Sequence, residues 1–459
     1  MKTDWDGKRV TIIGGARQGQ AAARWLAHHG ASVTVNDRRT SDQMASARSA
    51  LTGTAVNWEL GSHPVEILDS TDIVCISGGV PLDNPIVVEA IRRGVPLTND
   101  TQIFMDVVPC KTVGVTGSAG KTTTTMLVGQ MARTACGNKA YVGGNVGDPL
   151  LNYVDEMEPE DLAILEISSF QLEQMTTSPN VAAVLNITPN HLDRHGTMEV
   201  YSAAKQRILD FQGKNDTAVL GREDPGSWNL SSKVVGRLVS FGFSSLPDTQ
   251  DGSYIADGIL HLRERGVEIP LLRWDQVQLR GDHNVLNVLA AFAISCAAGL
   301  PLDAMLTAAE EFRGVPHRLE FVREWKGSQW YNDSIATAPE RTMAAIRSFN
   351  EPIILLLGGR DKKLPWDRLV DLIRERVDHV VLFGEASELI STALGKPVEG
   401  RRPYTLEHCK GLEEAVQTAS RMAIPGCVVL LSPGGTSFDQ FNDFEERGEA
   451  FRKWVLGLS

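Results

Sequence analysis

The sequence lacks a long hydrophobic run, closely paired cysteines and an excess of basic residues. No stretch approaches the roughly 18 apolar residues of a membrane-spanning helix, so we expect no membrane insertion. The six cysteines form no C-x-x-C pair, which is typical of reduced thiols in a cytosolic protein. The net charge of −12 argues against a general nucleic-acid-binding surface, although a local basic pocket for phosphates stays open. The opening stretch MKTDWDGKRV contains no apolar signal segment, so the sequence predicts a cytoplasmic protein.

What is present indicates an α/β protein of several domains. A chain of 459 residues is too long for one hydrophobic core and suggests about three domains. Buried strands alternate with helical segments through much of the chain, which favours doubly wound sheets. We predict a Rossmann-like domain over residues 1–99, a central ATP-binding domain over 100–315 and a second Rossmann-like domain over 316–459. Residues 228–280 differ, because the short runs Val234–Val239, Tyr254–Leu262 and Val267–Leu272 predict a small antiparallel patch.

The strongest motif is the stretch KTVGVTGSAGKTTTT at Lys111–Thr125. A β-branched run leads into a glycine turn, and a helical pattern follows directly. Strand, glycine turn and helix are the context of a phosphate loop, in which backbone N–H groups and a lysine hold phosphates and a hydroxyl binds Mg²⁺. Val115 stands where the strict G-x-x-x-x-G-K-[ST] pattern needs glycine, so the match is to a shorter G-x-x-G-K-T form. The alternative is an ordinary glycine turn before a helix.

The first domain opens with a predicted βαβ unit. Gly14-Gly15-Ala16-Arg17-Gln18-Gly19 follows a strand, and Asp37 ends the next strand about twenty residues on, which is the dinucleotide layout. Ala16 breaks the G-x-G-x-x-G pattern, so NAD and other nucleotides both remain candidates. The turn Ser77-Gly78-Gly79 ends a further strand and is either a ligand-binding turn or a plain tight turn.

Several candidate residues follow the phosphate loop. Glu166 ends an apolar strand and is either a Mg²⁺ partner or a cap for the next helix. His191 and Asp193 are candidates for phosphate and metal contacts, although a lone histidine is more often structural. Lys205 lies on a predicted helix, where lysine is usually a solvated charge. In the last domain, polar residues gather again where predicted strands end: Asp333, Lys362 and Ser437.

Together these motifs resemble the Mur ligases over essentially the whole chain. The stretches TGSAGKTTTT, LEISSFQLE, LNITPNHLDRHG, YSAAKQRIL, GDHNVLN, PHRLE, YNDSIAT and LLSPGGTSFDQFNDFEERG occur in the order of that family. The stretches ISSFQL and SFDQF are the most specific, and they point to the glutamate-adding members. The resemblance implies three α/β domains, of which the first binds UDP instead of NAD.

The resemblance also implies a role for each motif. ATP would be bound by Gly117, Ser118, Ala119, Gly120, Lys121, Thr122, Thr123, Asn287, Arg318 and Asp333. Two Mg²⁺ ions would be held by Thr122, Glu166, His191 and Lys205, with Lys205 carbamylated, and Lys121, Glu166, His191 and Lys205 would be the catalytic residues. The UDP-sugar substrate would contact Arg17, Gln18, Asp37, Arg38, Ser77, Gly78, Gly79 and Asn145, and glutamate would contact Thr337, Lys362, Ser437 and Phe444.

The implied reaction is ATP-dependent addition of D-glutamate to UDP-N-acetylmuramoyl-L-alanine through an acyl phosphate, by a monomer that needs no nucleic acid. One departure bears on the amino acid. The family usually has N-D-S-K-A-T, whereas this chain has Ile335 in place of the lysine. L-Glutamate is therefore kept as an alternative substrate. A nicotinamide dehydrogenase and an NTP-binding switch are alternatives from other classes.

Overall fold

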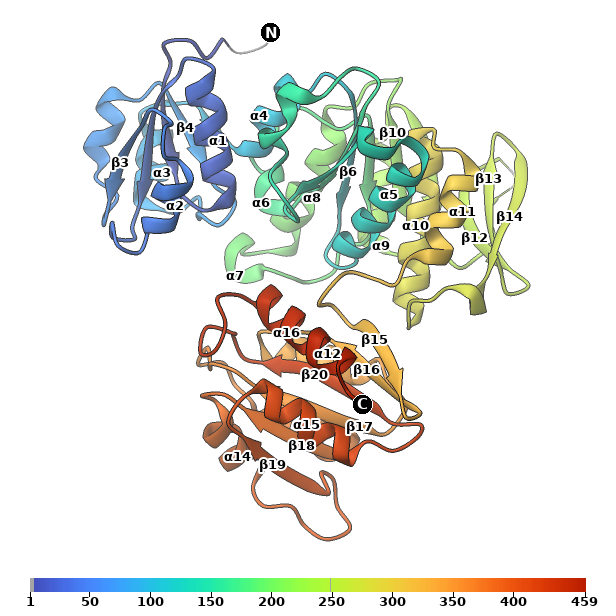
Figure 1. Cartoon of the computed structure of the whole chain (residues 1–459). Helices are drawn as coiled ribbons and strands as arrows, with labels where there is room; N and C mark the ends of the chain where they lie inside the picture. Colours follow the sequence, from blue (N-terminus) through green and yellow to red (C-terminus); the bar gives the residue numbers. More distant parts are fainter. Residues whose placement is uncertain (1–3, 248) are drawn as a thin grey trace. The chain divides into compact units, whose positions relative to one another are not determined.

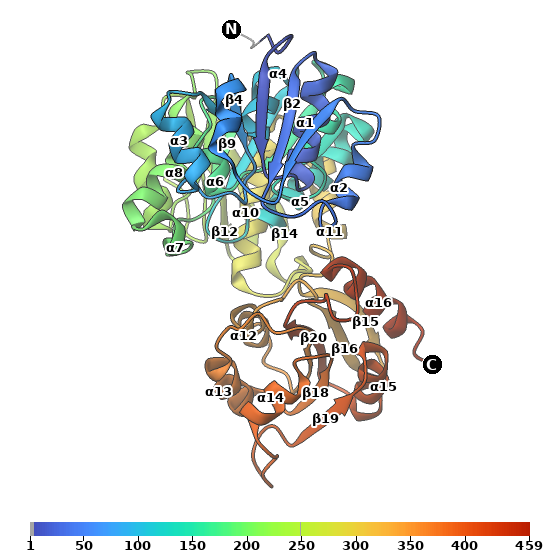
Figure 2. The same cartoon turned by 90° about the vertical axis from the view of Figure 1, so that its left-hand side faces the viewer.

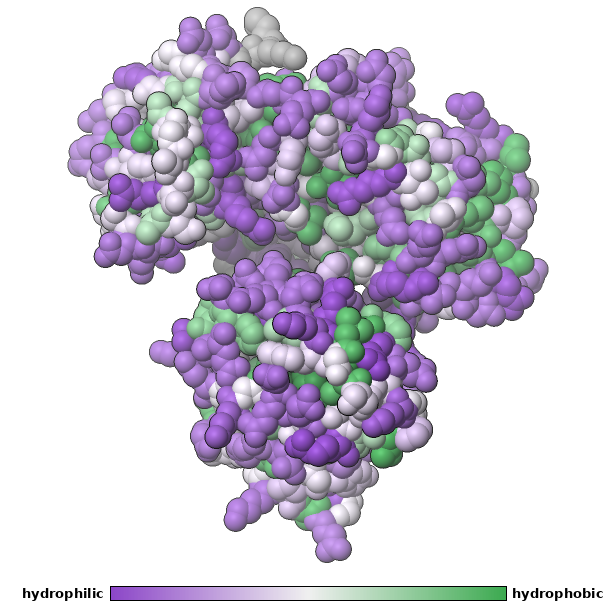
Figure 3. Space-filling model, in the orientation of Figure 1, coloured by the Kyte–Doolittle hydropathy of each residue, from purple (hydrophilic) through white to green (hydrophobic). Residues whose placement is uncertain are grey.

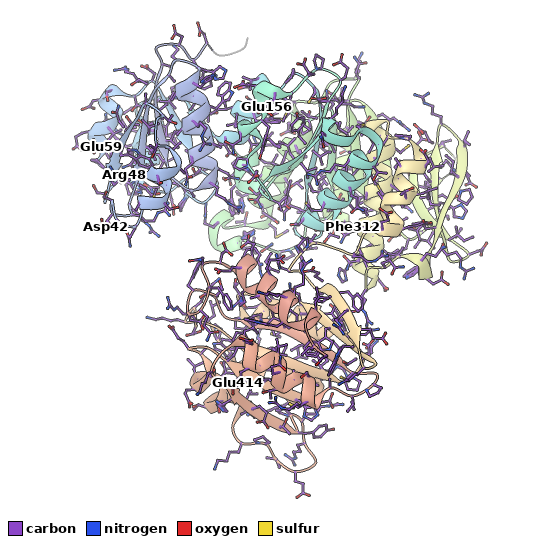
Figure 4. All side chains as sticks on the ribbon, viewed as in Figure 1. Asp42, Arg48, Glu59, Glu156, Phe312 and Glu414 are labelled. Carbon is purple, nitrogen blue, oxygen red and sulfur yellow. The ribbon has the colours of Figure 1, made fainter. Side chains whose placement is uncertain are left out.

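The computed structural model describes residues 4–247 and 249–459 (Figure 1). It forms two compact units. The first unit extends to Gln278 and resumes over Asp282–Phe312. The second unit comprises Leu279–Gly281 and Arg313–Ser459. Phe312, the last residue of the first unit, is labelled in Figure 4. The strands described in these residues form three sheets. The predicted three-domain α/β architecture is confirmed, and the boundaries at residues 99 and 315 stay a prediction.

The N-terminal sheet is parallel, with the order β3-β2-β1-β4-β5. Its strands carry alternating or continuous apolar side chains and are flanked by three helices. The elements are β1 (Arg9–Ile13), α1 (Arg17–His28), β2 (Ser32–Asp37), α2 (Ala45–Ala50), β3 (Val56–Leu60), β4 (Ile73–Ile76), α3 (Pro85–Arg92) and β5 (Leu97–Thr98). The chain leaves β1 for β2 on one side and reaches β4 on the other. The turns after β1 and β4 therefore lie together at a topological switch point, where open α/β sheets bind ligands.

The central sheet has the order β14-β13-β12-β11-β10-β9-β6-β8-β7 in the described residues. It is parallel from β7 to β12 and antiparallel from β12 to β14. The strands are β6 (Lys111–Thr116), β7 (Ala140–Gly144), β8 (Leu162–Glu166), β9 (Val181–Val184), β10 (Thr217–Gly221), β11 (Arg237–Phe241), β12 (Asp251–Ala256), β13 (Ile259–Glu264) and β14 (Val267–Arg273). The predicted antiparallel patch is confirmed for β12–β14, which continue the main sheet. The run at residues 234–239 was wrongly included, because it overlaps β11, which pairs parallel with β10 and β12.

One strand prediction in this patch is wrong. The run Tyr254–Leu262 is two strands, β12 and β13, joined at Asp257 and Gly258. Both residues have positive φ, 50° and 73°, as a two-residue hairpin turn requires. The Asp-Gly pair is the sequence signal that identifies such a turn.

Helices cover the central sheet on both faces. They are α4 (Asp100–Val107), α5 (Lys121–Cys136), α6 (Ser169–Leu172), α7 (Leu192–His195), α8 (Met198–Asp210), α9 (Pro225–Trp228), α10 (Asp282–Ala298) and α11 (Leu302–Glu311). Strand β6 pairs with both β8 and β9, so the segments that follow these three strands meet at one edge. The phosphate-loop sequence, Glu166 and Asn186 lie at that edge.

The C-terminal sheet has the order β15-β16-β20-β17-β18-β19, with antiparallel β15 at its edge. Its elements are β15 (Glu320–Trp325), β16 (Ser328–Asn332), α12 (Pro339–Arg347), β17 (Ile353–Gly358), α13 (Asp367–Arg376), β18 (His379–Phe383), α14 (Ser387–Leu394), β19 (Thr405–Cys409), α15 (Leu412–Met422), β20 (Val428–Gly434) and α16 (Phe444–Leu456). Helices α12–α14 flank one face and α15–α16 the other (Figure 2). Neighbouring leucines of β17 therefore enter different cores, Leu355 with α13 and Leu356 with α15.

The visible surface is mainly hydrophilic, with hydrophobic side chains scattered over it (Figure 3). Among the described residues, no helix combines the length and the hydrophobicity needed to cross a membrane.

Candidate functional site

The phosphate-loop sequence forms a tight turn between β6 and α5. Gly120 is the N-cap of α5 with φ +83°, and a Cβ there would lie 2.3 Å from Asn287 Oδ1. The turn is held by Asn186, whose carbonyl accepts from the Ser118 N–H and whose Oδ1 accepts from the Ala119 N–H at 2.8 Å. Lys121 Nζ donates to the Gly117 carbonyl at 2.9 Å. The predicted strand–turn–helix is confirmed, and the helix dipole and lysine make its concave side favourable for phosphate.

Glu166 connects the phosphate loop to a second glycine-rich turn, residues 143–147, which lies at the end of β7 and contains Asn145. Its Oε2 accepts from the Thr122 hydroxyl at 2.7 Å, and its Oε1 accepts from Asn145 Nδ2 at 2.9 Å. The capping alternative for Glu166 is wrong, because Ser168 caps α6 and Gln171 bonds back to the Ser168 N–H in a capping box. A carboxylate and a hydroxyl in contact beside a phosphate turn are oxygen donors of the kind that Mg²⁺ prefers. These residues therefore fit a Mg²⁺ ion bound with nucleotide.

Lys205 faces the same loop from α8. Its side chain is buried, and Nζ donates to the Gly117 carbonyl at 2.9 Å and lies 3.4 Å from Thr116 Oγ1. Burial, followed by repulsion from Lys121, lowers the pKa of Lys205 to about 7, while Glu166 acts in the opposite direction. The expectation of a solvated surface charge is wrong for this lysine. A buried amine with this pKa is substantially neutral at physiological pH.

His191 lies on an exposed turn that precedes α7, with φ 53°. Its ring is 5.3 Å from that of Phe170. The side chain of Asp193 lies outside the described part of the structure. No group of three His, Cys, Asp or Glu side chains suited to a metal occurs among the described residues. Thr122 and Glu166 are thus directly joined and Lys205 lies against the same loop, whereas His191 belongs to a separate turn.

Sequence reasoning missed a buried chain of polar side chains between α6 and α7. Ser169 Oγ lies 2.9 Å from His195 Nε2, and His195 Nδ1 lies 3.0 Å from Glu173 Oε1. The order of groups is that of a hydrolytic triad, but Ser169 is only 4% exposed and the Phe170 ring stacks on His195. The arrangement therefore ties α6 to α7. Nothing in the spacing of these residues along the chain signals the contact.

In the N-terminal domain, the turns after β1 and β4 are bonded to each other. Ser77 Oγ donates to the Gly14 carbonyl at 2.7 Å, and Gly78 and Gly79 follow it. Arg17 is exposed at the start of α1, and Gln18 Nε2 reaches the Gly144 carbonyl at 3.3 Å. The predicted turn residues thus gather at one edge of the domain.

Asp37 is buried at the end of β2 beside these turns. It accepts bonds from the Gly15 N–H at 2.9 Å and from Arg39 Nη2 at 2.6 Å. Burial would raise the pKa of Asp37, but the bonds from Arg39 and Gly15 outweigh it and hold this pKa well below its usual range. Arg38, predicted with Asp37 to bind the UDP end of the substrate, is exposed, and the partner of Asp37 is Arg39, which was not predicted. The D-x-R spacing at a strand end is the signal that could have found it.

The residues expected to bind the rest of ATP belong to both compact units. Asn287, in α10, accepts from Thr124 Oγ1 at 3.4 Å and donates to Asn284 at 3.0 Å. Arg318 is exposed, and Asp333 is buried in the other unit, where it accepts from Ser432 Oγ at 2.8 Å and from the Leu319 N–H at 3.2 Å. Burial raises the pKa of Asp333 to about 7, against the effect of its Ser432 bond.

The residues expected to bind glutamate lie together in the C-terminal unit. Lys362 Nζ donates to Thr337 Oγ1 at 3.0 Å. Ser437 is buried after β20, and Phe444 begins α16, where its carbonyl accepts from Ser334 Oγ at 2.8 Å. Arg447, which was not expected, bonds to the carbonyls of Ser334 and Gly435 in the same region.

Three family profiles match the chain. They are the Mur ligase MurD-like N-terminal domain over residues 8–99, the Mur ligase middle domain over 115–295 and the Mur ligase glutamate ligase domain over 317–435. The UDP-N-acetylmuramoylalanine–D-glutamate ligase of Pelotomaculum thermopropionicum is 39% identical over 100% of this chain and 99% of its own. The enzyme of the same name from Geobacter metallireducens is 39% identical over 98% of both chains.

Solved structures share the fold at low sequence identity. MurF from Acinetobacter baumannii has a TM-score of 0.58 at 16% identity, covering 97% of this chain and 94% of its own. The UDP-N-acetylmuramate–alanine ligase MurC from Thermotoga maritima has a TM-score of 0.55 at 21% identity, covering 98% and 99%.

Proposed function

The chain belongs to the Mur ligase family, and from this membership we propose that it is the ATP-dependent ligase that adds D-glutamate to UDP-N-acetylmuramoyl-L-alanine in peptidoglycan precursor synthesis. The observation that carries the proposal is the phosphate loop whose Thr122 hydroxyl bonds Glu166, in a chain that aligns from end to end with ligases of that name.

The chemistry suits these residue types. A carboxylate is a poor electrophile toward an amine, so the γ-phosphoryl group of ATP first passes to the alanine carboxylate and ADP leaves. The amine of glutamate then attacks the acyl carbon, loses a proton and displaces inorganic phosphate. Lys121 at the N-terminus of α5 would neutralise charge on the phosphates. Thr122 and Glu166 would hold Mg²⁺, which would supply further positive charge for phosphoryl transfer. Positioning and charge neutralisation are the main tasks of the protein.

We propose that the side-chain amine of Lys205 is carbamylated. Its neutral amine can attack CO₂, forming an N–C bond and releasing a proton, which leaves an anionic carbamate. The carbamate would compensate the burial of the Lys205 side chain, because its oxygen atoms could pair with a cation. It would also give a second Mg²⁺ ion an oxygen ligand. His191 would complete this metal site.

The remaining roles follow the family assignment. Arg17, Gln18, Asp37, Arg38, Ser77, Gly78 and Gly79 would bind the UDP end, and Asn145 the sugar-peptide portion. Asn287, Arg318 and Asp333 would bind ATP, and Thr337, Lys362, Ser437 and the Phe444 backbone would bind glutamate. Because the substrates are ATP and a UDP-linked sugar, we place the reaction in the cytoplasm; the monomeric state stays a prediction.

Lys121→Ala tests the assignment directly. We expect ATP-dependent phosphate release with UDP-N-acetylmuramoyl-L-alanine and D-glutamate to fall by about 10³-fold, since the lost contact acts on charge in the transition state. Lys214→Ala, at an exposed lysine in a loop, is the matched control and should retain full activity. A folded Lys121→Ala protein with near-normal turnover would refute the phosphate-loop assignment.

Two further measurements test the alternative functions. A dehydrogenase would change the fluorescence of NADH when titrated with it. An NTP-binding switch would release phosphate without any amino acid.

A further inference from the structure

The loop after β16 lacks a cation at the position where the family usually has one. Residue 335 is isoleucine, and its carbonyl accepts a bond from Arg341 Nη1 at 3.3 Å. Arg341 lies in the first turn of α12, and its side chain is exposed. The Arg341 side chain thus points back from α12 to the loop that contains Asp333, Ile335 and Thr337.

The position of Arg341 is unfavourable for the helix itself. The N-terminus of a helix carries the positive end of the dipole, where cations destabilise and anions are preferred. No side chain caps α12, and its N-cap residue is Ala338. Helix stability therefore gives no reason for an arginine here, whereas binding an anion does.

Two more cations lie in the same region without a carboxylate in direct contact. The acceptors described for Arg341, Lys362 and Arg447 are all neutral: the Ile335 carbonyl, the Thr337 hydroxyl, and the Ser334 hydroxyl with the Ser334 and Gly435 carbonyls. Arg447 is fully buried. Loss of solvent, followed by the charges of Arg341 and Arg447, lowers the pKa of Lys362, so both arginines act on this lysine. Asp333 attracts Arg341, which Arg318 repels, and Asp439 attracts Arg447. Cations gathered in this way favour an anionic ligand.

We propose that Arg341 binds a carboxylate of the incoming amino acid and supplies the positive charge that Ile335 does not. The inference rests on the proposed ligase function and extends its amino-acid site by one residue. A guanidinium binds a carboxylate with two parallel N–H···O bonds, a geometry that an ammonium cannot provide. With Lys362 on Thr337 as a second cation, the site suits a dicarboxylic amino acid in preference to its amide.

The test measures the KM for each substrate in Arg341→Ala. We expect the KM for D-glutamate to rise about tenfold or more, with the KM values for ATP and the UDP-sugar within about twofold of wild type. Arg341→Gln is shorter than arginine and uncharged but keeps an amide donor, and Arg341→Lys keeps the positive charge. A large rise in the glutamine variant with a smaller rise in the lysine variant identifies charge as the cause. Arg347→Ala, at an exposed arginine in the last turn of α12, is the matched control and should leave all three values unchanged.

A double variant tests the exchange of charges. Adding Ile335→Lys to Arg341→Ala should recover part of the lost affinity for D-glutamate. If the wild-type enzyme is active and neither Arg341→Ala nor Arg341→Gln changes the KM for D-glutamate from the wild-type value, the inference alone is overturned. A wild-type enzyme without amino-acid-dependent phosphate release would overturn the proposed function, and this inference with it.

Discussion

A lysine enclosed by protein holds its proton weakly, and Lys205 lies in such an environment. Its Nζ contacts the Gly117 carbonyl, with Lys121 close enough to repel it. If the group is carbamylated, Lys205→Ala should lose activity by about 10²-fold or more, and a short aliphatic carboxylic acid should restore part of it by replacing the carbamate. The same acid should not restore Lys121→Ala, which keeps Lys205. An active wild-type enzyme with an unmodified Lys205 at high resolution would contradict the carbamate.

Asp333 predicts a pH dependence of stability. Its pKa is raised from 3.8 to about 7, because burial disfavours the charged form. Between these values the unfolded chain has lost the proton that the folded chain keeps, so the free energy of unfolding should decrease as pH rises from about 4 to about 7. The penalty is at most about 4 kcal/mol and is complete above pH 7. Thermal unfolding of the ligand-free protein should show this slope, and Asp333→Asn should flatten it. An equal slope in both proteins would contradict the assignment.

Local motifs identify some site residues, and tertiary contacts decide the others. Gly120, Lys121 and Thr122 follow one another in the chain, so the phosphate turn could be predicted from sequence. Asp37 was found by its place at a strand end, but its partner Arg39 was not among the predicted residues. The Ser169–His195 contact and the approach of Arg341 to Ile335 depend on how separate segments pack, and no spacing along the chain signals them.

At the scale of single elements, α6 is a helix of one turn that depends on its cap. Ser168 Oγ accepts from the Gln171 N–H at 3.3 Å, and Gln171 Oε1 accepts from the Ser168 N–H at 2.9 Å. We expect Ser168→Ala to destabilise α6 by about 1 kcal/mol, which corresponds to about fivefold faster hydrogen exchange in residues 169–172. Ser46→Ala, at an exposed serine inside α2, is the control and should leave exchange in α6 unchanged. Unaltered exchange in Ser168→Ala would show that packing alone holds the turn.

Apolar, fully buried strands were predictable, and short or amphipathic elements were not. The strand predicted at Leu162–Glu166 has those bounds in the structure, because its first four residues are apolar and all five are buried. Strand β3 has the sequence VNWEL and lies at the edge of its sheet, with two of its five residues exposed and none buried, so it lacks a continuous apolar run. Helix α2 has only six residues and one buried side chain. Such elements are stabilised by their neighbours more than by their own pattern.

At the scale of the whole molecule, the three sheets repeat one arrangement. Each places its candidate residues where strands end at a switch in strand order: Ser77 after β4, Glu166 at the end of β8, and Asp333 after β16. This arrangement could be predicted from alternating strands and helices, since ligands bind at such ends in open α/β sheets. The two compact units hold different parts of the proposed machinery, the phosphate loop in one and the amino-acid residues in the other. Substitutions in the phosphate loop should therefore act mainly on the KM for ATP, and substitutions at the amino-acid residues mainly on the KM for D-glutamate.

The residues proposed to bind the carboxylates of the amino acid belong to the C-terminal unit, so we expect this unit to govern the handedness of the substrate. The relatives that align over the full chain are named as D-glutamate ligases, so we expect kcat/KM to favour D- over L-glutamate by about 10²-fold or more. Handedness is set by where the carboxylates and the amine fall around one carbon. Thr337, Lys362 and Arg341 would fix the carboxylates. Lys362 bonds Thr337 and Arg341 bonds the Ile335 carbonyl, so the charge proposed to replace that at position 335 lies on the same loop. The change at Ile335 should therefore be tolerated without a change of enantiomer. Phosphate release measured in parallel with the two enantiomers decides the matter: a preference for L-glutamate would mean that the displaced cation has inverted the site.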